Sequence, residues 1–137
     1  MKLHRYSIWP FILIAAIFTA SSQSSLAIPK TGFSYDKITH FLIFGLLATS
    51  LMRIPYFLKK GWKGVLLAIL IASFYGIIDE FRQMFTAGRS VEFKDWVADT
   101  SGAVLASILY LKWDWYRSVL EKRSFGNYKS VTSKETT

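Results

Sequence analysis

The chain has 137 residues, which is enough for one domain and too short for two ordinary ones. It is 52% hydrophobic and 17% aromatic yet carries a formal net charge of +8, a combination typical of a membrane protein with basic loops. The absence of cysteine excludes disulfides and thiol chemistry, and the scattering of Lys and Arg in short groups between apolar stretches argues against nucleic-acid binding.

Four apolar stretches predict an all-α integral membrane bundle of four transmembrane helices. In chain order they cover residues 8–20, 36–54, 65–78 and 96–113. Some of their uncharged cores are shorter than the roughly 20 residues that a span requires, but aromatic and basic flanks extend each to spanning length. Residues 65–78 are apolar on all sides, whereas a helix of a soluble bundle would keep a polar stripe.

The first stretch has a second interpretation. Lys2 and Arg5, the apolar core and a small-residue sequence ending at Ala27 resemble a cleavable signal peptide. Cleavage after Ala27 would leave three spans. We expect the segment to be retained, because the small bundle would otherwise lose one of its walls.

The distribution of Lys and Arg predicts the orientation of the spans. Two lie at the amino terminus, four between the second and third stretches and six in the tail, against two in the first connection and three in the third. Twelve basic residues on one side against five on the other place both termini in the cytoplasm. We assign residues 1–116 to the membrane domain and expect residues 117–137 to be a polar, disordered tail.

The acidic residues gather on the opposite side. Six lie at the predicted outer ends of the helices or in the outer connections: Asp36, Asp79, Glu80, Glu92, Asp95 and Asp99. Ionisable residues at membrane depth are costly, so they normally face the interior of the bundle and pair with one another. A functional site at the outer end is therefore the leading hypothesis.

Helical spacing predicts that these groups converge. Offsets of three and four place residues on one face of each helix: Asp36 and His40; Ser73, Gly76, Glu80 and Gln83; Asp95, Asp99, Gly102 and Ala106. Small residues let helices approach closely in lipid, so Gly76, Gly102 and Ala106 are expected contact points. We expect His40, Glu80, Asp95 and Asp99 to share one pocket, with Arg89 above it, where Arg89 either pairs with Glu80 or shares a ligand phosphate with it.

Several of these residues also have a structural interpretation. Asp95 can cap the start of the fourth helix, and His40 can be an interior histidine bonded to a neighbouring helix. A surface ion pair is the favoured interpretation of Asp79 and Arg82, which are three residues apart.

Two further site types are not expected. A zinc site could be built from His40 with Glu80, Asp95 or Asp99. Such a site would have one usable histidine and no cysteine, so we predict neither a metal nor a cofactor. Ser90, His40 and Asp95 have no spacing that matches a known nucleophile motif.

Four fragments resemble the VanZ-like family in order and spacing, over residues 35–110. They are Asp36-Lys37-Ile38-Thr39-His40-Phe41, Asp79-Glu80-Phe81-Arg82-Gln83, Gly88-Arg89-Ser90, and Asp95-Trp96-Val97-Ala98-Asp99-Thr100-Ser101-Gly102. The resemblance implies a bacterial membrane protein of a family named for a member linked to low-level teicoplanin resistance, with no established general activity. Asp99 departs from the family pattern, in which asparagine is common at this position.

Resemblance and spacing together give a set of candidate ligand-binding residues: Asp36, Lys37, His40, Glu80, Gln83, Arg89, Ser90, Asp95 and Asp99. The resemblance also points to Gly88 and Gly102. Arg89 suits a phosphate through its planar fork, Lys37 adds charge, and His40 and Glu80 are the candidates for proton transfer.

The leading functional hypothesis is an outward-facing pocket in the bacterial inner membrane that binds or processes an anionic, lipid-linked cell-envelope component. The alternative is a non-catalytic membrane module whose ionic cluster is structural and whose surface recruits a partner. Ion transport is disfavoured, because the inner halves of the second, third and fourth helices carry few polar residues.

Overall fold

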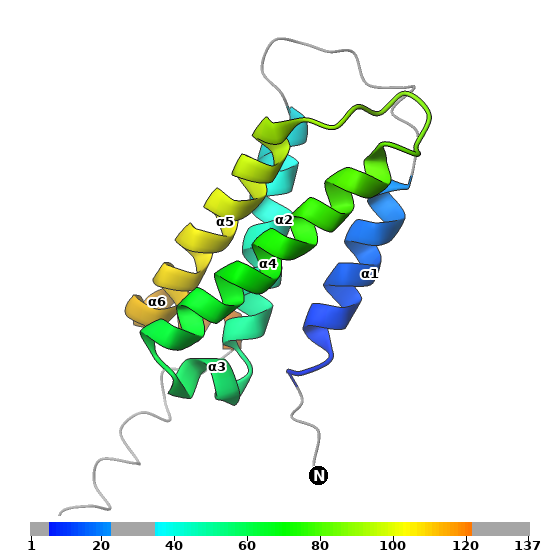
Figure 1. Ribbon diagram of the computed structural model, residues 1–137. Coiled ribbons are helices and arrows are strands. Elements are labelled where there is room, and N and C mark those ends of the chain that lie inside the picture. The colour runs from blue at the N-terminus through cyan, green and yellow to red at the C-terminus, as the bar shows by residue number, and fades with distance from the viewer. Residues whose placement is uncertain (1–5, 23–34, 122–137) are drawn as a thin grey trace, which may run out of the picture.

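Six α-helices make up the secondary structure of residues 6–22 and 35–121, the parts of the chain that the computed structural model describes (Figure 1). Four are long and correspond to the four predicted stretches: α1 (Trp9–Ser21), α2 (Tyr35–Met52), α4 (Trp62–Gln83) and α5 (Phe93–Lys112). Two are short: α3 (Pro55–Lys59) and α6 (Asp114–Glu121). The described residues contain no strand, so the all-α prediction is confirmed.

Proline and glycine punctuate the connections. Pro55 starts α3, where its fixed φ suits the first helical turn and its missing N–H is not needed. Gly61 has a φ of 55° and separates α3 from α4, and Gly88 has a φ of 77° in the connection from α4 to α5. Both values lie in the left-handed region, which favours glycine. These turns reverse the chain twice and set α2, α4 and α5 side by side.

Small residues bring α2 and α5 together. A Cβ added to Gly102 would lie 2.0 Å from the carbonyl oxygen of Phe41, and one added to Gly45 would lie 3.2 Å from the carbonyl oxygen of Gly102. A Cβ on Gly76 of α4 would lie 2.8 Å from Asp99 Oδ2 on α5. The predicted close approach at Gly76 and Gly102 is therefore confirmed.

The bundle has apolar side chains on its surface as well as in its core. Two buried clusters, one around Phe44 and Leu47 and the other around Met52 and Tyr110, fill the interior. The outer face of α4 is also apolar, with side chains between 56% and 65% exposed: Leu66, Leu70, Phe74 and Phe81. Buried carboxylates beneath an apolar surface reverse the arrangement of a soluble protein.

Among the described residues, α4 is the one helix long and apolar enough to cross a membrane by length and composition, with a mean hydropathy of 1.8. Helix α1 is apolar but shorter. The number of membrane crossings and the cytoplasmic location of the termini therefore stay predictions.

The carboxyl-terminal boundary differs from the prediction. Helix α6 continues to Glu121, so residues 117–121 are helical and not part of a disordered tail. Tyr116 and Leu120, four residues apart, pack together against the cluster around Met52 and Tyr110 and anchor this helix. Residues 122–137 and the possible cleavage site at Ala27 lie outside the described residues.

Candidate functional site

The candidate site lies where α2 and α5 begin and α4 ends, at the end of the bundle opposite α3 and α6 (Figure 1). Because α4 runs antiparallel to α2 and α5, the last turn of α4 meets the first turns of the other two. Each helix contributes a part of the site: Asp36, Lys37 and His40 from α2; Asp79, Glu80 and Gln83 from α4; Asp95 and Asp99 from α5.

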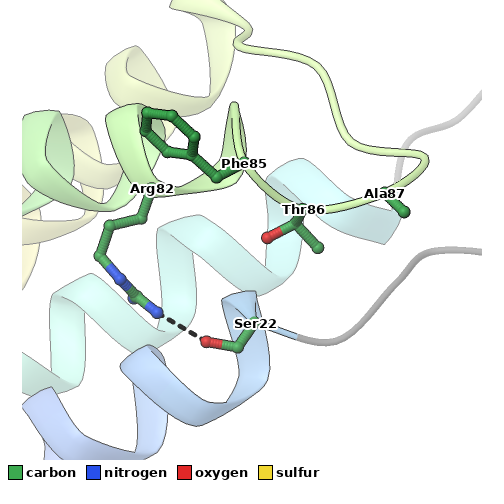
Figure 2. Close-up of a pocket in the computed structure, with 5 residues that line it drawn as sticks. All are labelled: Ser22, Arg82, Phe85, Thr86 and Ala87. Carbon is green, nitrogen blue, oxygen red and sulfur yellow. Dashed lines mark hydrogen bonds between the residues drawn. The ribbon is translucent and has the colours of Figure 1, made fainter.

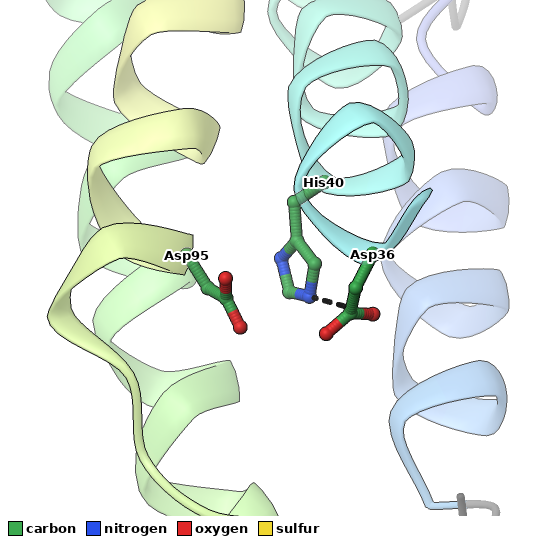
Figure 3. A group of neighbouring side chains, drawn as sticks. All are labelled: Asp36, His40 and Asp95. Carbon is green, nitrogen blue, oxygen red and sulfur yellow. Dashed lines mark ion pairs between the residues drawn. The ribbon is translucent and has the colours of Figure 1, made fainter. Parts of the chain in front are cut away.

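His40 is held at the centre of the site. Its Nδ1 lies 2.7 Å from Oδ1 of Asp99, a carboxylate with no exposed surface, and its ring stacks parallel to Phe44. Its Nε2 lies 4.0 Å from Oδ1 of Asp36. Figure 3 shows the imidazole between the carboxylates of Asp36 and Asp95. One nitrogen is thus fixed by Asp99, and the other lies nearest to Asp36.

Glu80 is buried, and only one of its two carboxylate oxygens has a hydrogen-bond partner. Its Oε2 accepts a hydrogen bond of 2.9 Å from the backbone N–H of Glu92, whereas its Oε1 has no hydrogen-bond partner. Glu80, His40 and Asp99 each offer a ligand atom, and these atoms lie within 4.8 Å of one another. The expected convergence of these three side chains is observed; that they bind a ligand stays a prediction.

Two cations close the site from α2 and from the α4–α5 connection. Lys37 Nζ lies 2.9 Å from Glu92 Oε2 and 3.2 Å from Asp95 Oδ1. Arg89 extends its guanidinium to Asp36, with 3.6 Å between NH1 and Oδ1. The predicted Glu80–Arg89 ion pair is wrong for this structure, because Arg89 pairs with Asp36 of α2 and the Glu92 amide bonds Glu80 instead. The alternative, that Glu80 and Arg89 share a ligand phosphate, stays a prediction.

A second polar cluster ties α1 to α4. Asp79 is 1% exposed and accepts hydrogen bonds from Ser21 Oγ at 2.5 Å and Gln83 Nε2 at 3.1 Å. Arg82 NH1 lies 3.4 Å from the same carboxylate. The predicted pairing of Asp79 with Arg82 is correct, but the surface interpretation is wrong, because α1 covers the carboxylate.

Arg82 also caps the end of α1. Its NH2 donates to the carbonyl oxygen of Phe18 at 3.1 Å and to Ser22 Oγ at 2.6 Å, as Figure 2 shows for Ser22. The guanidinium carbon lies 3.4 Å from the centre of the Phe18 ring. Its donors are therefore taken up by bonds that hold two helices together. The hollow beside it, lined by Phe85 and Thr86, is open and has a volume of about 540 Å³.

Other predicted residues take different places. Ser90 is exposed in the α4–α5 connection, and Gln83 belongs with Asp79. Helix α5 begins at Phe93, three residues before the predicted start, so Asp95 lies in its first turn and pairs with Lys37; it does not cap the helix.

Sequence reasoning missed two residues that complete the clusters. Ser21 ends an apolar run and carries no signal that it bonds Asp79. Glu92 was counted among the outer acidic residues but was not chosen, although it bonds Glu80 through its amide and Lys37 through its carboxylate.

A cavity of about 80 Å³ opens beside the central histidine. Its polar lining includes Asp36, His40, Asp79, Gln83 and Arg89, and its apolar lining includes Ile17, Ile43 and Phe44. A lining of both polar and apolar side chains suits a small polar group attached to an apolar chain.

Comparison with models of protein families gives a match. The family model described as VanZ/LLP1 matches residues 1–116, which include the four long helices and all of the polar residues above. No curated protein and no solved structure matches the chain. Because the match covers more than half of the 137 residues, the chain belongs to the VanZ-like (VanZ/LLP1) family.

Proposed function

We propose that this VanZ-like protein is a multi-pass protein of the bacterial inner membrane whose polar cluster faces outward and binds the phosphate-bearing headgroup of a lipid-linked cell-envelope component. The apolar outer face of α4 supports a membrane setting, because a soluble bundle of this size would cover such a surface. The excess of Lys and Arg at the end that carries α3 and α6 supports an outward position for the cluster.

The observation that carries the proposal is the state of Arg89. Its Nε has no hydrogen-bond partner, and its ion pair with Asp36 is long, at 3.6 Å. By contrast, Arg82 in the last turn of α4 is bonded to Asp79, Ser21, Ser22 and the Phe18 carbonyl. Arg89 lines the cavity with free donors in a fork that matches two phosphate oxygens.

The walls of the cavity suit a lipid-linked ligand. Ile17, Ile43 and Phe44 line it on the side towards the middle of the bundle, and Arg89 and His40 line the polar side. A phosphate on Arg89 with its chain along these apolar residues would use both surfaces. His40 and Glu80 stand close enough to take part in proton transfer if the bound group reacts.

Paired arginine variants test the proposal. Arg89→Lys keeps the charge but loses the planar fork, so we expect at least about a tenfold loss of function per molecule at normal membrane abundance. Arg82→Lys is the matched control: it breaks the bonds to α1, so we expect lower abundance with unchanged function per molecule. Abundance is measured by quantitative blot, and function by complementation of a null strain, with teicoplanin susceptibility as the readout suggested by the family.

The structural alternative has support of its own, because Lys37, Glu92 and Asp95 already link α2 to α5 by ion pairs. If the cluster only stabilises the fold, every substitution should change abundance and function in parallel. Full function of Arg89→Lys and Arg89→Ala at normal abundance would overturn phosphate binding by this residue.

A further inference from the structure

The outer cluster has more negative than positive side chains. Five carboxylates surround His40 or pair with its neighbours: Asp36, Glu80, Glu92, Asp95 and Asp99. Two fixed cations, Lys37 and Arg89, pair with three of them. Three negative charges therefore remain when all five carboxylates are ionised, and protonation of His40 cancels one. Such an excess in a largely buried site calls for a further cation.

We infer that Nε2 of His40, together with the carboxylates of Asp36 and Asp95, forms a binding site for one divalent transition-metal ion. The three residues each offer a ligand atom, and these atoms lie within 4.8 Å of one another (Figure 3). Two ligands of one ion at about 2.1 Å each are at most about 4.2 Å apart. Small inward movements of the two carboxylates therefore bring all three atoms to bonding distance.

The partner of Nδ1 determines which side of the ring binds the metal. The 2.7 Å between Nδ1 and Asp99 Oδ1 is too short for two ligands of one ion, which lie about 3 Å or more apart at ordinary angles, and it fits a hydrogen bond. A neutral His40 that donates its Nδ1–H to Asp99 leaves the Nε2 lone pair free to bind a metal, 4.0 Å from Asp36 Oδ1. A carboxylate behind a metal-binding histidine is the usual outer partner, because it fixes the tautomer and the ring orientation.

Glu80 gives an independent indication of a missing cation. The residue is 5% exposed, and its Oε1 is buried without a hydrogen-bond partner. It offers a ligand atom within 4.8 Å of His40 and Asp99. A buried anionic oxygen without a partner is costly and needs an explanation, and a nearby metal or a water on that metal supplies one.

The donor set favours zinc or manganese over magnesium or calcium. One imidazole with carboxylates suits Zn²⁺ and Mn²⁺, whereas sites made of oxygen alone suit Mg²⁺ and Ca²⁺. The ion pairs of Lys37 and Arg89 do not prevent metal binding. If Asp95 turns to a metal, Lys37 still pairs with Glu92 at 2.9 Å. Arg89 lies 3.6 Å from Asp36, a long ion pair that leaves this carboxylate able to bind a metal. The Asp36 side chain is 49% exposed and provides an entry path.

Zinc binding by the full chain tests the site without reference to the ligand proposed above. Detergent-purified protein, stripped with a chelator and freed of any affinity tag, is titrated with Zn²⁺ alone and analysed for bound metal. We expect about one ion per chain. His40→Gln should abolish binding, and Asp36→Asn or Asp99→Asn should weaken it by about 10- to 100-fold.

Two control variants and a folding measurement make the result interpretable. Asp79→Asn makes the same Asp-to-Asn change as the test variants, but at a carboxylate outside the proposed metal site. His4→Gln removes the other histidine of the chain. Both variants should bind zinc as the wild type does. Each variant is compared by size-exclusion profile and helical circular dichroism. Failure of the folded wild type to bind stoichiometric zinc, or wild-type affinity in His40→Gln, would overturn the site.

Discussion

At the scale of single residues, neighbouring carboxylates of α4 differ in their partners. Asp79 accepts bonds from Ser21 and Gln83 and pairs with Arg82, so its charge is compensated within the fold. Glu80 has one oxygen bonded to a backbone amide and one without a partner. A compensated buried carboxylate is expected to stabilise the fold, whereas an uncompensated one is maintained at a cost and suggests a role in binding.

This difference gives a stability prediction. Asp79→Ala leaves the buried Gln83 Nε2 without its acceptor and Arg82 without its ion-pair partner, so we expect it to lower the free energy of unfolding by about 1–3 kcal/mol and to reduce membrane abundance. Glu80→Gln should leave abundance unchanged, because the amide oxygen can still accept the bond from the Glu92 backbone. Thermal unfolding of the purified variants measures their stability, and a quantitative blot measures their membrane abundance. An Asp79→Ala protein as stable as the wild type would show that this cluster does not hold α1.

Contacts that follow from spacing within one helix could be predicted from the sequence, whereas contacts that depend on how two helices pack could not. His40, Glu80 and Asp99 could be brought together from helical spacing, because Glu80 and Asp99 share helix faces with Gly76 and Gly102, and His40 follows Asp36 by one turn. The role of Ser21 could not, since it depends on which side of α4 the first helix covers. For the same reason, the three-residue spacing of Asp79 and Arg82 suggested a surface pair where the structure has a buried carboxylate.

At the scale of helices, the close contact of α2 with α5 positions the site. Gly102 lies against the carbonyl oxygen of Phe41, the residue after His40, and Asp99 is one turn before Gly102 on the same helix. The separation of the two backbones therefore sets the distance between His40 and Asp99.

Alanine substitutions at the two glycines of this contact should have graded effects. Gly102→Ala places a methyl group 2.0 Å from a backbone oxygen, so the helices must move apart, and we expect a loss of roughly 1–3 kcal/mol in stability. Gly45→Ala, with its nearest atom at 3.2 Å, should cost less. Comparison of the two unfolding temperatures checks the order. Equal effects would mean that this contact does not limit the packing.

The helices themselves were largely predictable, and the connections were not. Each long helix matches an apolar stretch, because apolar length is the dominant signal for a membrane helix. Helix α3 was missed because it is one short turn started by Pro55, and α6 because its polar composition hid the pair Tyr116 and Leu120 that packs inward.

At the scale of the whole molecule, the two ends of the bundle have opposite chemistry. Six of the eight acidic residues that the structure describes lie at one end, whereas six of the ten described Lys and Arg residues lie around α3 and α6 at the other. Apolar side chains such as Phe74, 65% exposed, cover the surface between them. The central claim is that this surface lies in lipid and that the carboxylate end faces outward.

Because the chain has no cysteine, single-cysteine variants test this claim directly. Ser90→Cys, Lys60→Cys and Phe74→Cys are treated with a membrane-impermeant maleimide in intact spheroplasts, after permeabilisation and after denaturation. We predict labelling of Ser90→Cys from outside, of Lys60→Cys after permeabilisation, and of Phe74→Cys after denaturation alone, because lipid covers a side chain that the isolated bundle exposes. Labelling of Phe74→Cys in the native state, or of Ser90→Cys and Lys60→Cys from the same side, would contradict it.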